Sequence, residues 1–175
     1  MAQTSLQGSV CNTNAALPNT GNAAPDFALL DTQLKEKSLA DFTADFTFIY
    51  VVPSLDTMVC ANTTKKLNDL AVAHLNKKDN IHFLVISADL PFAQQRFCKQ
   101  NKIKKLKPLS MMRSKQFAQD YGLLLIDGPL AGLTARAVFV LDSKKNILHT
   151  ELLADIAGEP DFEKAFTFFQ QQETT

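Results

Sequence analysis

Runs of hydrophobic residues indicate where the chain forms strands. The two clearest runs, Phe46–Val52 (FTFIYVV) and Ile81–Ser87 (IHFLVIS), are rich in aromatic and β-branched residues, as expected for strands buried on both faces. Pro53 ends the first of them. Four further stretches predict strands: Phe27–Leu30, Lys37–Leu39, Arg136–Leu141 and Ile147–Leu152. The polar segment Asp142–Asn146 separates the last two stretches and predicts a hairpin.

Apolar residues at helical spacing predict the helices. Leu67, Leu70, Ala71 and Leu75 fall on one face, which predicts a helix from about Met58 to Asn76. Proline is tolerated in the first turn of a helix, so Pro91 is expected to open a second helix, which carries Ala93, Phe97 and Cys98. Two more helices are predicted around Ser114–Tyr121 and over Asp161–Gln171.

The order of these elements predicts an α/β protein with a thioredoxin-like fold, in which helices flank a central mixed sheet. The order is β-α-β-α, then a helix and a loop, then β-β-α. Residues 1–26 are polar and turn-rich, which predicts an N-terminal arm or β-hairpin, and residues 122–134 are expected to form mostly loop. With neither an internal repeat nor a linker, residues 1–175 are expected to form a single domain.

Composition and charge narrow the class of protein. The 18 basic and 18 acidic residues balance, so no general attraction to nucleic acid or to an anionic membrane is expected. The 3 histidines stand far apart, so no metal site is predicted. The 6 glycines are scattered and form no phosphate-binding loop, and no cofactor is predicted. The chain has neither a long apolar span nor a basic residue before Lys35, so a membrane helix and a secretory signal are not expected. The 3 cysteines favour a reducing compartment, so a cytoplasmic location is predicted.

The segment from Pro53 to Cys60 (PSLDTMVC) carries the clearest chemical signal. It follows a strong strand and leads into a helix, so Cys60 is expected in the first helical turn. There the backbone N–H groups and the helix dipole stabilise a thiolate, the reactive form of cysteine. Thr57 is placed to hydrogen-bond the sulfur or a bound oxygen, and Pro53 to rigidify the turn. The alternative is that Cys60 is simply a small buried apolar residue.

This segment resembles the active-site signature of the peroxiredoxins. The stretches SADLPFAQQRFC (Ser87–Cys98), YGLLLIDGPLAGLTARAVFVLD (Tyr121–Asp142) and GEPDFEKAF (Gly158–Phe166) resemble the bacterial thiol peroxidase subfamily, whose members are atypical two-cysteine enzymes. The resemblance extends from about Leu6 to Phe169. It implies a thioredoxin fold and a homodimer.

The resemblance also implies roles for five residues. Cys60 would be the peroxidatic cysteine and Cys98 the resolving one, while Pro53, Thr57 and Arg136 would complete the peroxide pocket. A guanidinium group suits this chemistry because it stabilises the negative charge that develops on the peroxide oxygens. A structural salt bridge is the alternative role for the arginine. Because bridging needs the two cysteines close together, both helices are expected to unwind locally during turnover.

These inferences predict a thiol-dependent peroxidase that reduces hydrogen peroxide or organic hydroperoxides and is recycled by thioredoxin. Two alternatives remain. A dithiol–disulfide oxidoreductase is disfavoured because Thr57 and Thr63 stand where a second CxxC sulfur would lie. A redox sensor or relay of the same fold would turn over little peroxide. Cys11 is expected to be a spectator.

A basic run surrounds Cys98, and it allows two interpretations. It either raises the thiolate fraction of Cys98 and docks an acidic reductase, or it is a solvated helix end and loop, which is the favoured interpretation. The run consists of Arg96, Lys99, Lys102, Lys104, Lys105 and Lys107.

Overall fold

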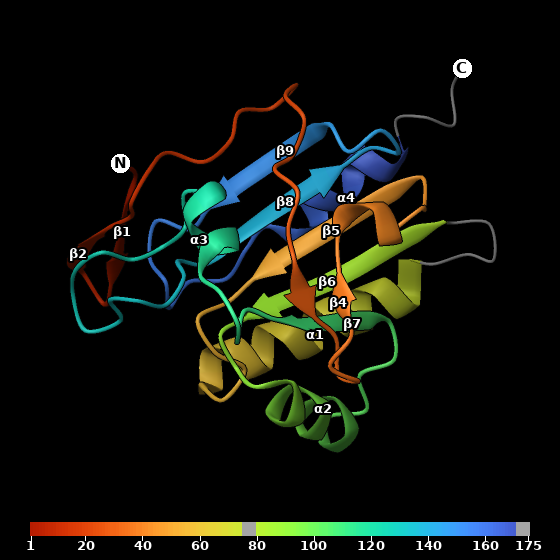
Figure 1. Cartoon of the computed structure of the whole chain (residues 1–175), viewed down its shortest axis with the longest axis horizontal. Helices are drawn as coiled ribbons and strands as arrows, with labels where there is room; N and C mark the ends of the chain where they lie inside the picture. Colours follow the sequence, from red (N-terminus) through yellow and green to blue (C-terminus); the bar gives the residue numbers. More distant parts are fainter. Residues whose placement is uncertain (75–79, 171–175) are drawn as a thin grey trace.

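A seven-stranded mixed sheet organises the chain in the computed structural model, which describes residues 1–74 and 80–170 (Figure 1). The pairs β5–β6 and β6–β7 are parallel, and the other neighbouring strands are antiparallel. In spatial order the strands are β4 (Glu36–Lys37), β3 (Leu29–Leu30), β7 (Leu106–Ser110), β6 (Ile81–Ser87), β5 (Phe46–Val51), β8 (Ala137–Leu141) and β9 (Ile147–Leu152).

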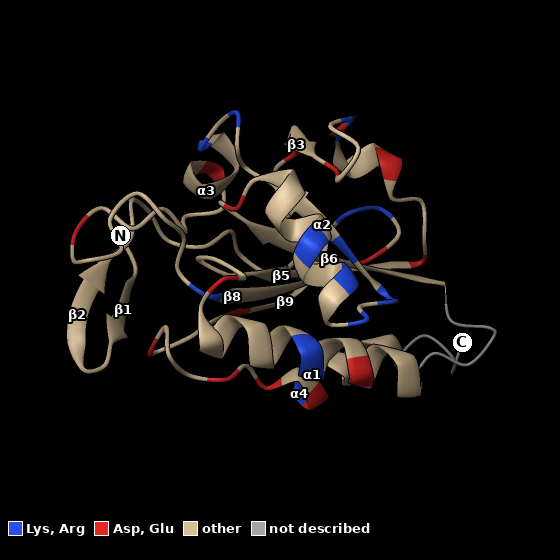
Figure 2. Ribbon diagram, turned by 90° about the horizontal axis from the view of Figure 1, so that it is seen from below, with Lys and Arg blue, Asp and Glu red and all other residues tan. Residues whose placement is uncertain are grey.

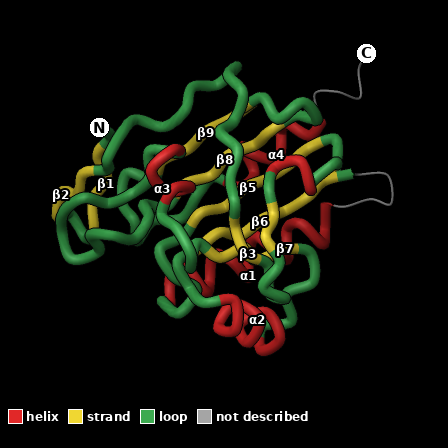
Figure 3. The backbone as a smooth tube through the Cα atoms, in the orientation of Figure 1, coloured by secondary structure: helices red, strands yellow, loops and turns green. Residues whose placement is uncertain are grey.

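Helices cover both faces of this sheet, which confirms the predicted architecture. The helices α1 (Met58–His74) and α4 (Phe162–Gln170) lie on one face, and the short helix α3 (Gln116–Asp120) lies on the other (Figures 2 and 3). Helix α2 (Pro91–Gln100) packs beside β7. None of the helices in the described part of the chain is long and apolar enough to cross a bilayer.

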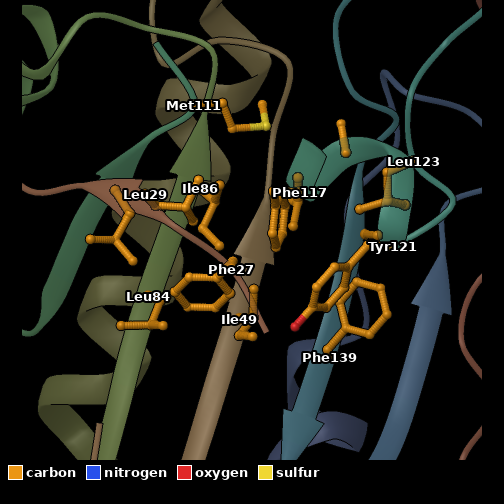
Figure 4. Packing of buried hydrophobic residues seen from close by; sticks show 14 of the residues in the cluster. Phe27, Leu29, Ile49, Leu84, Ile86, Met111, Phe117, Tyr121, Leu123 and Phe139 are labelled. Atoms are coloured by element: carbon orange, nitrogen blue, oxygen red, sulfur yellow. The ribbon is translucent and has the colours of Figure 1, made fainter. Parts of the chain in front are cut away.

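Strand β5 is buried along its whole length because both of its faces contribute to the core. Ile49 and Val51 belong to the hydrophobic cluster on the α3 side, part of which is drawn in Figure 4. Phe48 and Tyr50 belong to the cluster beneath α1 and α4. This alternation confirms the interpretation of Phe46–Val52 as a strand buried on both faces.

The N-terminal residues form the predicted hairpin, and the chain near β9 holds it in place. Strands β1 (Gln3–Leu6) and β2 (Ser9–Asn12) pair in a separate two-stranded sheet. The Asp155 carboxylate accepts hydrogen bonds from the Ser5 hydroxyl and from the N–H groups of Gln7 and Gly8. The pKa of Asp155 lies below its usual value. The largest cause is a hydrogen bond from the Ala157 N–H, and the bonds from the hairpin add to it.

Strand β7 was not predicted from the sequence. Its segment, LKPLS, contains Pro108 and adjoins the basic run, so it lacks the continuous apolar pattern of β5 and β6. Strand β3 pairs with β7 only at Ser110, so most of β7 lies at a sheet edge, where proline is tolerated.

Other differences concern the ends of elements. The predicted strand Lys37–Leu39 is instead β4 followed by a 3-10 turn, Leu39–Asp41. The predicted helix at Ser114–Tyr121 is shorter, since α3 has five residues. The expected ends of the first and last helices, Asn76 and Gln171, fall outside the described residues.

We expect the aromatic packing around Phe48 to contribute strongly to stability. Its ring centroid lies 5.4 Å from that of Phe83 and 5.6 Å from that of Phe166. Removing such a buried ring costs about 3–5 kcal/mol, so Phe48→Ala should lower the free energy of unfolding by that amount in urea titrations. The matched control is Phe92→Ala at a side chain 61% exposed, which should change it by less than about 0.5 kcal/mol. Equal losses in the two variants would contradict this assignment of the core.

Candidate active site

Cys60 lies where the predicted strand, turn and helix place it. Strand β5 ends at Val51, a loop follows, and Cys60 is the third residue of α1. Its side chain is only 1% exposed. The sulfur therefore belongs to the first turn of a long helix, at the positive end of its dipole, and is almost completely shielded from water.

The two other residues predicted on this loop shape the start of the helix. Pro53 is buried immediately after β5. The hydroxyl of Thr57 accepts a hydrogen bond from the Cys60 N–H (3.4 Å) and donates one to the carbonyl oxygen of Ser54 (3.2 Å). In this state the hydroxyl proton of Thr57 is used by the loop and is not donated to the sulfur.

Arg136 reaches Cys60 because of the way in which two strands pair. Strand β8 runs antiparallel to β5, with Ala137 opposite Val51, so the residue before β8 lies beside the point where the Cys60 loop leaves the sheet. The Arg136 side chain is 1% exposed, and its Nη2 donates to Cys60 Sγ at 3.0 Å. The structure thus joins two predicted residues that are 76 positions apart in the sequence.

Three further N–H groups of Arg136 also have partners. Nε donates to the carbonyl oxygen of Ile156 (2.7 Å), and Nη1 donates to the hydroxyls of Thr63 (2.9 Å) and Tyr50. Sequence reasoning missed these three partners. Two of them carry a recoverable signal, since Tyr50 lies on the α1 side of β5 and Thr63 lies one helical turn after Cys60. The Ile156 carbonyl carries none.

The charge at this site has one notable feature: the buried guanidinium has no carboxylate partner among the described residues. The ion pairs found there, Lys66–Glu159 and Arg113–Glu36, are exposed and do not involve Arg136. Burial raises the pKa of Tyr50 to about 12, so its hydroxyl is neutral at physiological pH. A buried charge without a counter-ion is strongly destabilising, and the Sγ atom of Cys60, which lies 3.0 Å from Nη2, is the ionisable atom in contact with the guanidinium that could carry a negative charge. Within residues 1–74 and 80–170, Arg136 thus forms no structural salt bridge of the kind considered from the sequence.

Cys98 lies on α2, where it is partly buried, and both it and Cys60 are free thiols. Burial raises the pKa of Cys98 to about 11. The residues of the basic run are exposed. Figure 2 shows blue segments of the ribbon on α2. The structure therefore favours the interpretation of this run as a solvated surface and gives no sign that it increases the thiolate fraction of Cys98.

Cys11 was expected in a polar arm, but it is fully buried. It lies on β2, packs in the hydrophobic cluster on the α3 side and donates weakly from Sγ to the carbonyl oxygen of Ser9 (3.6 Å). The described residues contain no group of three or more His, Cys, Asp or Glu side chains that could hold a metal ion.

Comparison with known proteins agrees with this geometry. Residues 19–166 match the Redoxin family model. The chain is 39% identical to the thiol peroxidases of Mycobacterium bovis and Mycobacterium tuberculosis over 165 residues, which cover 94% of this chain and 96% of each relative. Among solved structures, a peroxiredoxin-like protein from Aquifex aeolicus matches with a TM-score of 0.88 at 30% identity, over 98% of this chain and 97% of that one.

We expect the paired N–H groups of Arg136, and not its charge alone, to support the reactivity of Cys60. A lysine keeps the charge but loses the planar arrangement of donors. Arg136→Lys should therefore slow the oxidation of Cys60 by hydrogen peroxide by about 100-fold, the cost of removing one well-placed donor to a developing oxyanion. Quenched samples analysed by mass spectrometry would give the rate. The control is Arg113→Lys at an exposed ion pair, and an Arg136→Lys rate equal to that of the control would contradict this role.

Proposed function

The chain belongs to the redoxin family and is a thiol-dependent peroxidase, and we propose that Cys60 is its peroxidatic cysteine and Cys98 its resolving cysteine. One observation carries the proposal: Arg136 Nη2 lies 3.0 Å from Cys60 Sγ in a water-shielded site with no competing carboxylate among the described residues. The similarity to thiol peroxidases favours an enzyme that turns over peroxide, and it disfavours the two alternatives, a redox sensor and a dithiol oxidoreductase.

In the first half-reaction, the Cys60 thiolate attacks one oxygen of a hydroperoxide. The sulfur–oxygen bond forms as the oxygen–oxygen bond breaks, the sulfur is oxidised to a sulfenic acid, and the leaving oxygen takes up a proton to become water or an alcohol. Arg136 and the first N–H groups of α1 stabilise the negative charge on the oxygens. Pro53 shields the sulfur from water, and Thr57 binds a peroxide oxygen once its loop contact to Ser54 is exchanged.

In the second half-reaction, Cys98 attacks the sulfenic sulfur of Cys60. A disulfide forms, the Cys98 thiol supplies one proton, and the sulfenic oxygen leaves as water. A dithiol reductant of the thioredoxin type then transfers two electrons and two protons, which restores both thiols. We propose that this cycle operates in the cytoplasm, with residues 1–175 folded as one domain within a homodimer.

Hydrogen peroxide and organic hydroperoxides are both proposed substrates. Apolar side chains are exposed at the starts of the two helices that carry the cysteines: Met58 and Val59 on α1, and Leu90 and Phe92 beside or on α2. An alkyl group could contact these side chains while its peroxide group enters the site.

Single cysteine variants test the two assigned roles. Cys60→Ser should abolish peroxide reduction because serine cannot form the sulfenic acid. Cys98→Ser should retain the first oxidation but stop cycling with thioredoxin and thioredoxin reductase, measured as NADPH consumption. Cys11→Ser is the control and should cycle normally. Full cycling by Cys98→Ser would exclude Cys98 as the resolving residue.

The pH dependence of disulfide formation tests whether α2 opens first. In the folded helix the pKa of Cys98 is raised to about 11, so the rate of an attack from that helix would rise with pH up to about 11. If Cys98 attacks from an opened, solvated segment, the rate would rise only up to a pH of about 8.5, because that is the ordinary pKa of a thiol. We expect the second profile when Cys60 is oxidised at pH 7 and the sample is then shifted to higher pH. A rate still rising above pH 10 would contradict local opening.

A further inference from the structure

The Asp89 carboxylate joins the segments that carry the two cysteines. Its Oδ1 accepts a hydrogen bond from the Ser54 hydroxyl (2.6 Å), and its Oδ2 accepts one from the Leu55 N–H (2.7 Å). Ser54 and Leu55 belong to the loop that leads to Cys60, whereas Asp89 lies two residues before Pro91, the start of α2. A single side chain therefore connects the Cys60 loop to the start of the helix that contains Cys98.

The rest of the loop makes few polar contacts with other parts of the molecule. Within the described residues, the other hydrogen bonds of residues 54–57 stay inside the loop or join it to the first turn of α1. A cavity of about 50 Å³ lies between the two segments, with Leu55 and Asp56 on one side and Ala93 and Phe97 on the other. Apolar packing across this boundary is therefore incomplete, although Leu55 itself is buried, and the two bonds to Asp89 are the hydrogen bonds that join residues 54–57 to the start of α2 within the described part of the chain.

Asp89 is itself fixed to the sheet. The Ser87 hydroxyl donates to its carboxylate (2.6 Å), and the Ser110 hydroxyl on β7 donates to its carbonyl oxygen (2.5 Å). The fully buried Gln94 of α2 donates both to the Ser87 hydroxyl (3.0 Å) and to the carbonyl oxygen of Leu109 (2.8 Å). The Cys60 loop is thus attached to a rigid point at the carboxyl ends of β6 and β7.

We propose that Asp89 is a positioning residue that holds the Cys60 loop against the start of α2 and so sets how often the two segments separate. The inference rests on the proposed function, in which Cys98 must reach a Cys60 sulfur that is enclosed beside Arg136. Only the separated state allows the disulfide to form, while the joined state is the one in which peroxide reacts. Asp89 therefore governs the second half-reaction and has little influence on the first.

This assignment predicts unequal effects on two rate constants. Asp89→Asn weakens the bonds to Ser54 and Leu55, which should raise the population of the separated state about threefold to tenfold. Disulfide formation should accelerate by the same factor. The joined state remains dominant, so the rate of Cys60 oxidation should change by less than about twofold. A merely structural role would alter thermal stability without this selective acceleration.

The matched control is Asp127→Asn. Asp127 also accepts one bond from a backbone N–H and one from a side chain, both of Asn12 (2.7 and 2.6 Å), but it lies beside the N-terminal hairpin. The full-length wild type and both variants would be oxidised with one equivalent of hydrogen peroxide, quenched in acid and analysed by mass spectrometry for sulfenic acid and disulfide. Hydrogen exchange of residues 54–57 in the reduced proteins would report the opening directly.

Faster disulfide formation in Asp89→Asn alone, with faster exchange at Leu55, is the expected result. A disulfide rate within twofold of wild type, or equal acceleration in Asp127→Asn, would overturn the proposal. If Asp89→Asn fails to fold, Ser54→Ala removes one of the two bonds and keeps the carboxylate, with the same expectations. If the wild type forms no Cys60–Cys98 disulfide, the proposed function fails instead, and exchange at Leu55 still decides whether Asp89 holds the loop.

Discussion

The buried guanidinium of Arg136 constrains the rest of the structure. A charge that is almost completely removed from water needs hydrogen-bond partners and an opposite charge close by. Four N–H groups of Arg136 have partners: the Tyr50 hydroxyl, the Thr63 hydroxyl, the Ile156 carbonyl oxygen and the Cys60 sulfur, which lies where a counter-ion would be needed. The site therefore forms only when four parts of the chain are in place: strand β5, helix α1, strand β8 and the segment after β9.

The N-terminal hairpin contributes to the same constraint from outside the main sheet. Ser5 exchanges backbone hydrogen bonds with Ala154 and Ile156, and Asp155 binds the turn of the hairpin. These contacts fix the short segment that contains Ile156, whose carbonyl oxygen accepts the hydrogen bond from Arg136 Nε. A hairpin that carries none of the reacting groups thereby helps to orient the arginine.

In the proposed cycle, the enclosure that favours the reaction with peroxide opposes the step that follows. Cys60 is shielded beside Arg136, and burial raises the pKa of Cys98, so the folded state suits the proposed first half-reaction and disfavours the proposed second one. Both cysteines lie after parallel neighbouring strands, so their helices begin at the same edge of the sheet. The opening that we propose for disulfide formation is therefore located at that edge.

Features that depend on local pattern could be predicted from the sequence: the buried runs of β5 and β6, the helix that starts before Cys60, and the recognisable segment from Pro53 to Cys60. It could not reveal β7, because a lysine and Pro108 interrupt an apolar pattern that the sheet tolerates at a partly unpaired edge. It also could not place the Ile156 carbonyl at the site or Asp89 beside the Cys60 loop. Their roles depend on strand register and on contacts between distant segments, and only the tertiary structure decides these, because a hydrogen bond between distant residues leaves no period in the sequence.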